Sequence, residues 1–429
     1  MRPEVKALGS DRQDLVVVGG GILGACLAWD AALRGLKVAL VERGVVGCGT
    51  SANSLRIIHG GLRYLIRGDL PRMRESIRER SVLLRIAPGL VEPLPVAIPS
   101  GIPGYPNRSA LRAALALNDL ISAGRNRHLT PDRRLPSGRS LSALELRRLC
   151  PGLGQLARRG GALWYDARMS RPEQLTRAFV RSATERGALV AENACADRFT
   201  STGGRVLSVA IRDCQSGGIQ EVAARRFVLA AGPWTGEILA DAGAHTPPVP
   251  TSYAVGLNLV IGRRLADSAV GLRSERSATE DPVGGGRRFL FLVPQEGTTL
   301  VGTWYGSIGD RGVEAVLAEG RASLLQDLNR ACPGLELADG DVVAVQWGRL
   351  PVENRTRGNP MRLADRPRVI GPAELGVANL YAAETVKYTT ARAVAERVLD
   401  RIAGTLAAPI GRCRTAEMPL AGAGLGEVS

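Results

Sequence analysis

The N-terminal part of the chain alternates short apolar runs with a glycine-rich turn and a helix-forming stretch. Residues 15–18 form a continuous valine-rich run, typical of a strand that is buried on both faces in a parallel sheet. A turn from Gly19 to Gly24 follows, then residues 25–34 favour a helix and residues 37–41 a second strand. The pattern predicts a strand–turn–helix–strand unit with Glu42 directly after the last strand.

The spacing of this unit fits the binding of a dinucleotide. Gly19 permits a tight turn, Gly21 lets the backbone approach a pyrophosphate, and Gly24 allows close packing of the helix on the strand. The helix N-terminus then offers N–H groups and a positive dipole end to the phosphates. Glu42 lies where a carboxylate accepts hydrogen bonds from ribose hydroxyls, and it disfavours the 2′-phosphate of NADP. The motif by itself leaves NAD and FAD open.

Two later segments can return to the same sheet. Residues 226–234 predict a buried strand that closes in a Gly-Pro turn, and residues 379–383 predict another. Residues 391–402 have the periodicity of an amphipathic helix, and we expect Thr389 or Thr390 to cap it. Each segment, taken alone, is equally compatible with an ordinary strand or an ordinary capped helix.

Residues 47–64 change from small and polar to a sequence that carries His59, Arg63 and Tyr64. Loops of this composition often approach ligands, although a surface loop has the same composition. His59 is one of three histidines in the chain. Lys387 is unusual for another reason, since only Lys6 and Lys37 accompany it among the 56 basic residues and the rest are arginines.

Charge and cysteine content exclude several classes of protein. The net charge is +15 and the pI about 10.3, but the arginines are dispersed and no reader motif accompanies them, so we expect no nucleic-acid binding. A basic surface does allow peripheral contact with anionic lipid. Seven cysteines without close spacing favour reduced thiols over disulfides or a metal site, and the polar N-terminus favours a cytoplasmic protein. The longest uncharged apolar stretch, residues 15–29, is too short to cross a bilayer.

Taken together, these motifs resemble the FAD-dependent glycerol-3-phosphate dehydrogenases, within the superfamily of D-amino-acid-oxidase-like flavoproteins. The resemblance covers roughly residues 12–405, in the order of that family. The His-Gly-Gly-Leu-Arg-Tyr string is specific to it, whereas the glycine-rich turn is shared by many dinucleotide folds. The matching pieces are Gly19 to Gly24 with Glu42, Thr50-Ser51, residues 58–65, Tyr165-Asp166-Ala167, Gly232-Pro233-Trp234 and residues 387–390.

The resemblance implies an α/β (α+β) fold with a Rossmann-like FAD-binding domain and a substrate domain that carries an antiparallel sheet. Residues 253–261, 289–293 and 299–304 suit that sheet, with helices over residues 71–86 and 110–122. We expect the chain to be divided as follows: 12–65, 160–236 and 350–405 in the FAD-binding domain, 66–159 and 237–349 in the substrate domain, and 406–429 as a tail without the further helical domain of typical members.

The resemblance also implies the activity, which is oxidation of the secondary alcohol of glycerol 3-phosphate, or of a related hydroxylated anion, by hydride transfer to the flavin. Alcohol oxidation needs a base for the hydroxyl proton, and an anionic substrate needs cations. The resemblance places His59, Arg63 and Lys387 over the flavin as catalytic residues and adds Tyr64, Asn258 and Arg349 as substrate contacts. It implies FAD contacts at Gly19, Gly21, Gly24, Glu42, Arg43, Thr50, Ser51, Gly232, Thr389 and Thr390.

The chain departs from the family around the substrate. The family has Arg-Pro on a strand near residue 350, where this chain has Gly348-Arg349-Leu350-Pro351. Counted from the proline, Leu350 stands at the arginine position and Arg349 is one step away, which reverses the face on a strand. Either a bulge compensates or the phosphate site differs. The region around Asn258 is also less basic than in the family, which suggests a larger or less charged substrate.

Two other functions stay open at this stage. One is an FAD-dependent amine or amino-acid oxidase of the same superfamily, in which Arg349 clamps a carboxylate. The other is a non-catalytic FAD-binding protein. The expected partners are a small-molecule substrate and an electron acceptor, either quinone or oxygen. Peripheral contact at the inner face of the cell membrane is a further expectation, with residues 124–139 as a basic region that is also explained as a solvated surface.

Overall fold

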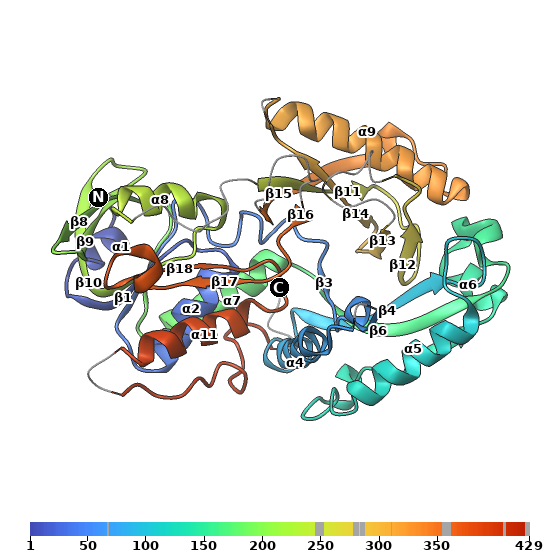
Figure 1. Cartoon of the computed structure of the whole chain (residues 1–429), viewed down its shortest axis with the longest axis horizontal. Helices are drawn as coiled ribbons and strands as arrows, with labels where there is room; N and C mark the ends of the chain where they lie inside the picture. Colours follow the sequence, from blue (N-terminus) through green and yellow to red (C-terminus); the bar gives the residue numbers. More distant parts are fainter. Residues whose placement is uncertain are drawn as a thin grey trace. The chain divides into compact units, whose positions relative to one another are not determined.

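Segments from separate parts of the chain assemble into two units (Figure 1). The computed structural model describes residues 1–66, 68–244, 253–277, 283, 288–309, 311–353, 362–405 and 409–424, without the side chains of Arg63 and Ile66. Unit 1 comprises Met1–Ala52, Arg171–Thr251 and Ala364–Ser429, and unit 2 comprises Asn53–Ser170 and Ser252–Leu363.

Unit 1 contains a sheet in the order β17-β18-β10-β1-β2-β7. The pairs from β18 through β10, β1 and β2 to β7 are parallel, and β17 joins β18 antiparallel. The first half of β10 also pairs with β9, which pairs with β8, so one long strand links a hairpin to the parallel sheet. The strands are β1 (Gln13–Val18), β2 (Val38–Val41), β7 (Leu189–Ala191), β8 (Ala194–Thr202), β9 (Arg205–Asp213), β10 (Ile219–Leu229), β17 (Arg368–Ile370) and β18 (Leu380–Glu384).

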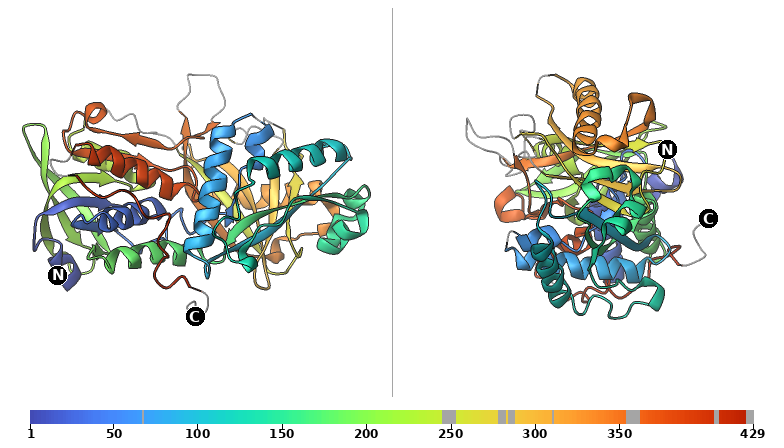
Figure 2. Two further views of the ribbon diagram at one scale, coloured as in Figure 1. Left: turned by 90° about the horizontal axis from the view of Figure 1, so that it is seen from below. Right: turned by 90° about the vertical axis from the view of Figure 1, so that its right-hand side faces the viewer.

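Three helices of unit 1 lie side by side, with α2 (Ile22–Leu33) in contact with both α7 (Pro172–Thr184) and α11 (Ala391–Ala403), as Figure 2 shows. Because α2 is covered along nearly its whole length, its sequence is apolar on all sides except at Asp30, which pairs with Arg34. The predicted strand–turn–helix–strand unit and the later strands and helix are therefore confirmed. The remaining helices of this unit are α1 (Pro3–Ala7), η3 (Gly232–Trp234), α8 (Thr235–Asp241) and α10 (Pro372–Leu375).

Unit 2 contains a sheet in the order β16-β15-β11-β14-β13-β12-β4-β6-β3, with β5 beside β6. The pairs are antiparallel except for β12 with β4, so the antiparallel sheet expected for this part of the chain is confirmed. Its strands are β3 (Ile57–Ile58), β4 (Val91–Pro99), β5 (Arg139–Leu141), β6 (Gly161–Met169), β11 (Tyr253–Ile261), β12 (Ala269–Arg273), β13 (Phe289–Pro294), β14 (Thr299–Ser307), β15 (Val342–Glu353) and β16 (Arg362–Leu363).

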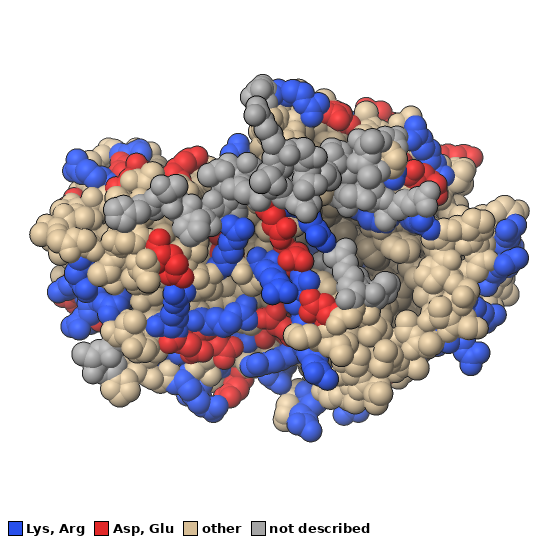
Figure 3. Space-filling view, viewed as in Figure 1, with Lys and Arg blue, Asp and Glu red and all other residues tan. Residues whose placement is uncertain are grey.

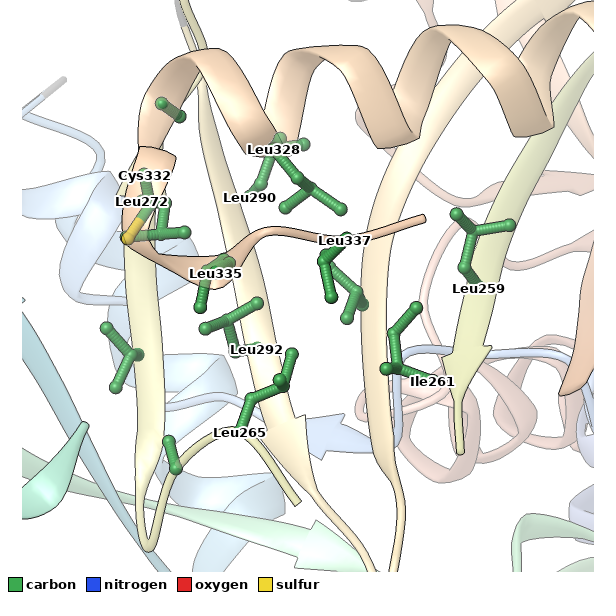
Figure 4. Close-up of a cluster of buried hydrophobic side chains, with 14 of the residues drawn as sticks. Leu259, Ile261, Leu265, Leu272, Leu290, Leu292, Leu328, Cys332, Leu335 and Leu337 are labelled. Carbon is green, nitrogen blue, oxygen red and sulfur yellow. The ribbon is translucent and has the colours of Figure 1, made fainter. Parts of the chain in front are cut away.

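The helix α9 (Val313–Ala331) covers one face of this sheet. Inward-facing leucines from the strands, among them Leu259, Leu290 and Leu292, form one cluster of buried side chains with Leu328 of α9 (Figure 4). The two helices expected beside the sheet are also present. The helices of unit 2 besides α9 are α3 (Leu62–Ile66), α4 (Leu70–Ile86), α5 (Arg108–Ile121), η1 (Pro131–Arg133), α6 (Ala143–Leu149), η2 (Pro151–Ala157), η4 (Pro333–Leu335) and η5 (Asp339–Asp341).

The units begin and end at residues that differ from the expected domain boundaries. Residues 53–65, 160–170, 350–353 and 362–363 belong to unit 2, because β3 pairs with β6 and β15 pairs with β11 along its length. Residues 237–244 belong to unit 1, where Leu239 of α8 is buried in the core. Strand pairing over long sequence separations thus determines where each unit ends.

The segment 409–424, expected as a tail, packs on unit 1. Thr415 is buried and accepts a hydrogen bond from Arg392 Nη1 of α11 at 2.9 Å. The backbone N–H of Ala421 donates to Ser182 Oγ of α7 at 2.9 Å. This segment therefore covers helices of the parallel-sheet unit.

Candidate active site

The glycine-rich turn between β1 and α2 is built from close backbone contacts. Gly19 has φ 107°, and a Cβ there would lie 2.6 Å from the carbonyl oxygen of Ala230 at the end of β10. A Cβ on Gly24 would lie 1.8 Å from Gly19 O. Gly21 is the N-cap of α2, and a Cβ there would meet only Ser51 Oγ within 4 Å, at 3.2 Å. The three glycines therefore have the geometry predicted from their spacing: a turn, an approachable backbone and a close helix–strand contact.

Two polar side chains organise this turn. Glu42 accepts hydrogen bonds from the backbone N–H of Gly20 at 2.6 Å and of Gly44 at 2.9 Å, one on each carboxylate oxygen. Ser51 Oγ accepts from the N–H of Ile22, the first residue of α2, at 3.0 Å. A carboxylate has about four acceptor positions, so Glu42 keeps capacity for a ribose hydroxyl. Thr50 directly precedes Ser51 in the chain.

A second group of predicted cofactor contacts lies where β10 ends. Gly232 has φ 55° and begins η3, the short turn that carries Trp234. The guanidinium carbon of Arg43 lies 4.0 Å from the Trp234 ring centroid, a cation–π contact. Trp234 was part of the recognised Gly-Pro-Trp string, but sequence reasoning gave it no role. Its contact with Arg43 links the end of β2 to the end of β10.

The turn before α11 carries Lys387, and the next residue, Tyr388, forms a hydrogen bond with α7. Thr385 Oγ1 donates to Lys387 O at 2.9 Å, which closes the turn. Tyr388 Oη donates to Pro172 O at 2.9 Å and lies 3.0 Å from Thr176 Oγ1. Burial raises the pKa of Tyr388, so this phenol stays protonated and serves as an anchor.

Thr389 and Thr390 are both buried at the start of α11. Thr390 is the N-cap residue, as expected, but no side-chain hydrogen bond caps the helix there, so the expected capping by a threonine hydroxyl is wrong. The helix instead begins after the Lys387–Tyr388 turn, with the N–H of Ala391 donating to Tyr388 O. The N–H groups of the first turn are then the donors that this end of α11 offers.

In unit 2, His59 follows β3 directly and precedes a glycine pair. Its ring lies 5.9 Å from that of Tyr64, edge to face, and Tyr64 is buried. Gly61 has φ 82°, and a Cβ there would lie 2.7 Å from Tyr64 Cδ2, so the turn requires glycine. The structure thus brings together His59 and Tyr64. Arg63 belongs to α3, and its side chain lies outside the described atoms.

Asn258 lies on β11, beside a bulge in the ladder with β14. It is buried, its Nδ2 donates to Asn53 O at 3.1 Å, and its Oδ1 accepts from Thr303 Oγ1 at 2.8 Å. Both ends of the side-chain amide are therefore engaged within unit 2. These bonds give Asn258 a structural role besides any contact with a substrate.

The ladder between β11 and β15 resolves the question raised by Leu350. Val255 pairs with Arg349 and Ala254 pairs with Leu350, and the register runs without interruption to the pair Val260–Ala344. No bulge of this ladder compensates for the displaced arginine. Residues paired across a ladder share a face, so Arg349 shares the face of buried Val255, which belongs to the core under α9. Leu350 shares the opposite face with Asn258.

Arg349 and Asn258 thus lie on opposite faces of one sheet and cannot contact the same ligand from one side. Lys387 belongs to unit 1, whereas His59, Arg63 and Tyr64 belong to unit 2. The predicted catalytic residues therefore come from both units.

The donor set of unit 1 fits a dinucleotide cofactor. The glycines from Gly19 to Gly21 have no Cβ atoms and lie directly before the first N–H groups of α2. The carboxylate of Glu42 follows the next strand. These are the features that a pyrophosphate and a ribose require.

Comparisons with known proteins agree with this fit. The model of a family described as FAD dependent oxidoreductase matches residues 14–401. A glycerol-3-phosphate dehydrogenase of Synechocystis sp. is 32% identical over 96% of this chain and 73% of its own length.

Two solved structures show the same fold. The glycerol-3-phosphate dehydrogenase from Bacillus halodurans, complexed with FAD, has a TM-score of 0.72 and 23% identity, covering 99% of this chain and 70% of its own. Glycine oxidase from Geobacillus kaustophilus has a TM-score of 0.59 and 20% identity, covering 96% of this chain and 99% of its own.

Proposed function

Because the chain belongs to the family of FAD-dependent oxidoreductases, we propose that it oxidises the secondary alcohol of glycerol 3-phosphate, or of a related hydroxylated anion. The observation that carries the proposal is the likeness to a glycerol-3-phosphate dehydrogenase, at 32% identity over 96% of the chain. The members of this family are enzymes, which argues against the non-catalytic alternative. FAD, when bound, would supply the hydride acceptor, and quinone or oxygen would be the final electron acceptor.

We assign the cofactor contacts to two groups of residues in unit 1. The N–H groups at the start of α2 bind the pyrophosphate, and Glu42 accepts from a ribose hydroxyl. Buried threonines mark the start of α11, whose N–H groups favour negative charge. The full set is Gly19, Gly21, Gly24, Glu42, Arg43, Thr50, Ser51, Gly232, Thr389 and Thr390.

The chain's own residues then handle the substrate's proton and charge. His59 accepts the hydroxyl proton as the carbinol hydrogen leaves with its electron pair, and the alcohol becomes a ketone. Arg63 and Lys387 stabilise the negative charge that develops on the alcohol oxygen. Tyr64 orients the imidazole through the edge-to-face contact.

An amine or amino-acid oxidase is the second candidate, since glycine oxidase shares the fold. In that reaction Arg349 was the expected clamp for a carboxylate. Its pairing with Val255 on the core face argues against the clamp. The alcohol is therefore the substrate class that we favour.

The test is reduction of the flavin without oxygen. Glycerol 3-phosphate should bleach the oxidised flavin band, and glycine should leave it unchanged. His59→Asn should slow the reduction about 100-fold or more, in the range of general-base loss. His128→Asn is the matched control, because His128 is exposed with φ 66°, a conformation that asparagine tolerates. Bleaching by glycine alone would replace this proposal with the amine oxidase.

We also propose a cytoplasmic protein with peripheral contact at an anionic membrane. Leu117 and Leu120 of α5 are 44% and 73% exposed, and Arg112 on the same helix is exposed as well. Basic and acidic side chains are interspersed on the face shown in Figure 3. Among the described helices, none has both the length and the apolarity needed to cross a bilayer. Sedimentation with vesicles that contain anionic lipid tests the contact, and Leu120→Gln should weaken it.

A further inference from the structure

A buried ion pair contacts the turn that contains His59, Gly60 and Gly61. Asp166 of β6 and Arg80 of α4 are 6% and 3% exposed, and Arg80 Nη1 donates to Asp166 Oδ1 at 2.6 Å. The same carboxylate oxygen accepts from the backbone N–H of Gly60 at 2.5 Å. The other oxygen accepts from Trp164 Nε1 at 3.1 Å. One carboxylate therefore joins a helix, a strand and the residue next to His59.

The guanidinium of Arg80 is held through one nitrogen, which also contacts the backbone. Arg80 Nη1 also donates to Tyr165 O at 2.9 Å. A Cβ on Gly60 would lie 2.3 Å from this nitrogen, so a side chain there would displace the guanidinium. The contact with Arg80 gives a reason for the first glycine of the His-Gly-Gly string.

Every part of the turn is fixed within unit 2. On one side, Ile58 pairs with Ala167 of β6. In the middle, Asp166 accepts a hydrogen bond from the N–H of Gly60. On the other side, Gly61 packs against the Tyr64 ring. His59 lies between the first two attachments, so the path of its backbone depends on both.

We propose that the Arg80–Asp166 pair is a positioning device that fixes the backbone of His59 for proton transfer; this inference rests on the proposed function. Buried ion pairs contribute little net stability compared with apolar residues of similar volume. Asp166 of this pair accepts a hydrogen bond from the buried N–H of Gly60. An apolar side chain in its place would leave that N–H without an acceptor. A base displaced by about 1 Å loses on the order of 100-fold in rate.

The first test is Asp166→Asn in the FAD-loaded enzyme. Either orientation of the amide sets an NH2 group against a donor, since Gly60, Arg80 and Trp164 all donate to the carboxylate. Flavin reduction by glycerol 3-phosphate should slow about 10- to 100-fold. KM should change by less than about threefold, because the lost interaction serves the reacting step. FAD content should stay the same.

Asp327→Asn is the matched control. Asp327 of α9 is also a buried carboxylate of unit 2, and it accepts from Ser274 Oγ at 2.6 Å and from the N–H of Glu275 at 3.0 Å. This substitution disturbs a carboxylate of the same kind away from His59. A purely structural effect would appear equally in both variants, whereas the positioning effect belongs to Asp166→Asn alone.

Hydrogen–deuterium exchange of the peptide over residues 57–64 gives a readout that is independent of activity. Asp166→Asn should accelerate exchange in this peptide in the FAD-loaded enzyme without substrate, and Asp327→Asn should not. If wild-type enzyme fails to reduce its flavin with glycerol 3-phosphate, the proposed function fails, but the exchange result still decides the positioning role. Unchanged exchange and an unchanged rate in folded Asp166→Asn overturn the inference.

A second pair of variants covers the case in which Asp166→Asn does not fold. A single nitrogen of Arg80 makes both described bonds, so Arg80→Lys keeps a donor and a charge, whereas Arg80→Met keeps neither. Arg80→Lys should retain most of the rate and the slow exchange, and Arg80→Met should lose both. Equal behaviour of the two variants overturns the proposal.

Discussion

The two units hold their functional residues in different ways. In unit 1, Gly20 N–H reaches Glu42 across 22 residues of chain, within one strand–turn–helix–strand unit. In unit 2, Gly60 N–H reaches Asp166 across 106 residues, and Asn258 reaches Asn53 across 205. The Gly19–Gly24 turn therefore follows from a local rule of chain geometry, whereas the His59 turn and Asn258 depend on the register of a large sheet.

The largest effect expected from breaking the local rule comes from Gly24→Ala. The new Cβ would lie 1.8 Å from Gly19 O, a backbone atom that cannot rotate away. We expect a loss of about 3 kcal/mol in the free energy of unfolding, at the upper end for overpacking, and loss of bound FAD. Denaturant unfolding and the ratio of flavin to protein absorbance measure the two effects.

Gly236→Ala is the control for that substitution. Gly236 lies in α8, and a Cβ there would meet nothing within 4 Å. Alanine in a helix gains about 0.5–1 kcal/mol over glycine, so this variant should be as stable as wild type or more so. Equal destabilisation by both substitutions would contradict the close-packing role of Gly24.

An intermediate effect is expected from exchanging two neighbours on β15. The double variant Arg349→Leu with Leu350→Arg keeps composition and charge but moves the cation to the face of Asn258. A hydrogen bond to a charged group contributes about 1.5–3 kcal/mol, so KM for glycerol 3-phosphate should fall about tenfold or more. KM for glycerol, which lacks the phosphate, should stay the same.

The single variants separate the two positions. Leu350→Arg alone should lower KM, and Arg349→Leu alone should change it by less than about twofold, because position 349 is on the core face. If Arg349→Leu raised KM tenfold, the substrate would be contacted from the face under α9. The β11–β15 register would then not determine which position on β15 binds the substrate's phosphate.

Sequence reasoning succeeded where a function depends on neighbouring residues. The Gly19–Gly24 turn and both flanking strands follow from spacing and apolar periodicity, and the strands at 253–261 and 289–293 were expected for the sheet that the resemblance implies. It could not find the contacts of Asp166, which was recognised only as part of a string, because strand pairing brings Gly60 to it and helix packing brings Arg80. The one signal available was an acidic residue within a strand that is otherwise mostly buried.

The same limit explains the expectations that changed. Spacing could place Arg349 one step from the family position, but only the β11–β15 register shows that no bulge restores its face. Thr390 was correctly expected at the start of α11, yet the absence of a side-chain cap there depends on the turn through Tyr388. Local patterns predict where an element begins more readily than which atoms satisfy its end.

The smallest effect compares one buried tyrosine from each unit. Tyr388→Phe removes the donor to Pro172 O and should cost about 1 kcal/mol at neutral pH. Burial raises the pKa of Tyr105 in unit 2 to about 12, and its Oη accepts from the N–H of Arg273. Both tyrosines stay protonated when folded and ionise near pH 10 when unfolded, so each contributes stability below pH 10 that falls as pH rises. For Tyr105 this loss spans pH 10 to about 12.

The unfolding free energies of Tyr388→Phe and Tyr105→Phe, measured from pH 8 to 11, should therefore each converge on that of wild type as the pH rises. A constant difference across this range would mean that ionisation of the tyrosine does not contribute. Activity should distinguish the two, because only Tyr388 anchors the turn that carries Lys387. Flavin reduction should slow about threefold in Tyr388→Phe and stay unchanged in Tyr105→Phe, since a small displacement affects the rate only where a reacting group moves. Equal rates in both variants would mean that the hydrogen bond from Tyr388 to Pro172 of α7 holds α11 without fixing the position of Lys387.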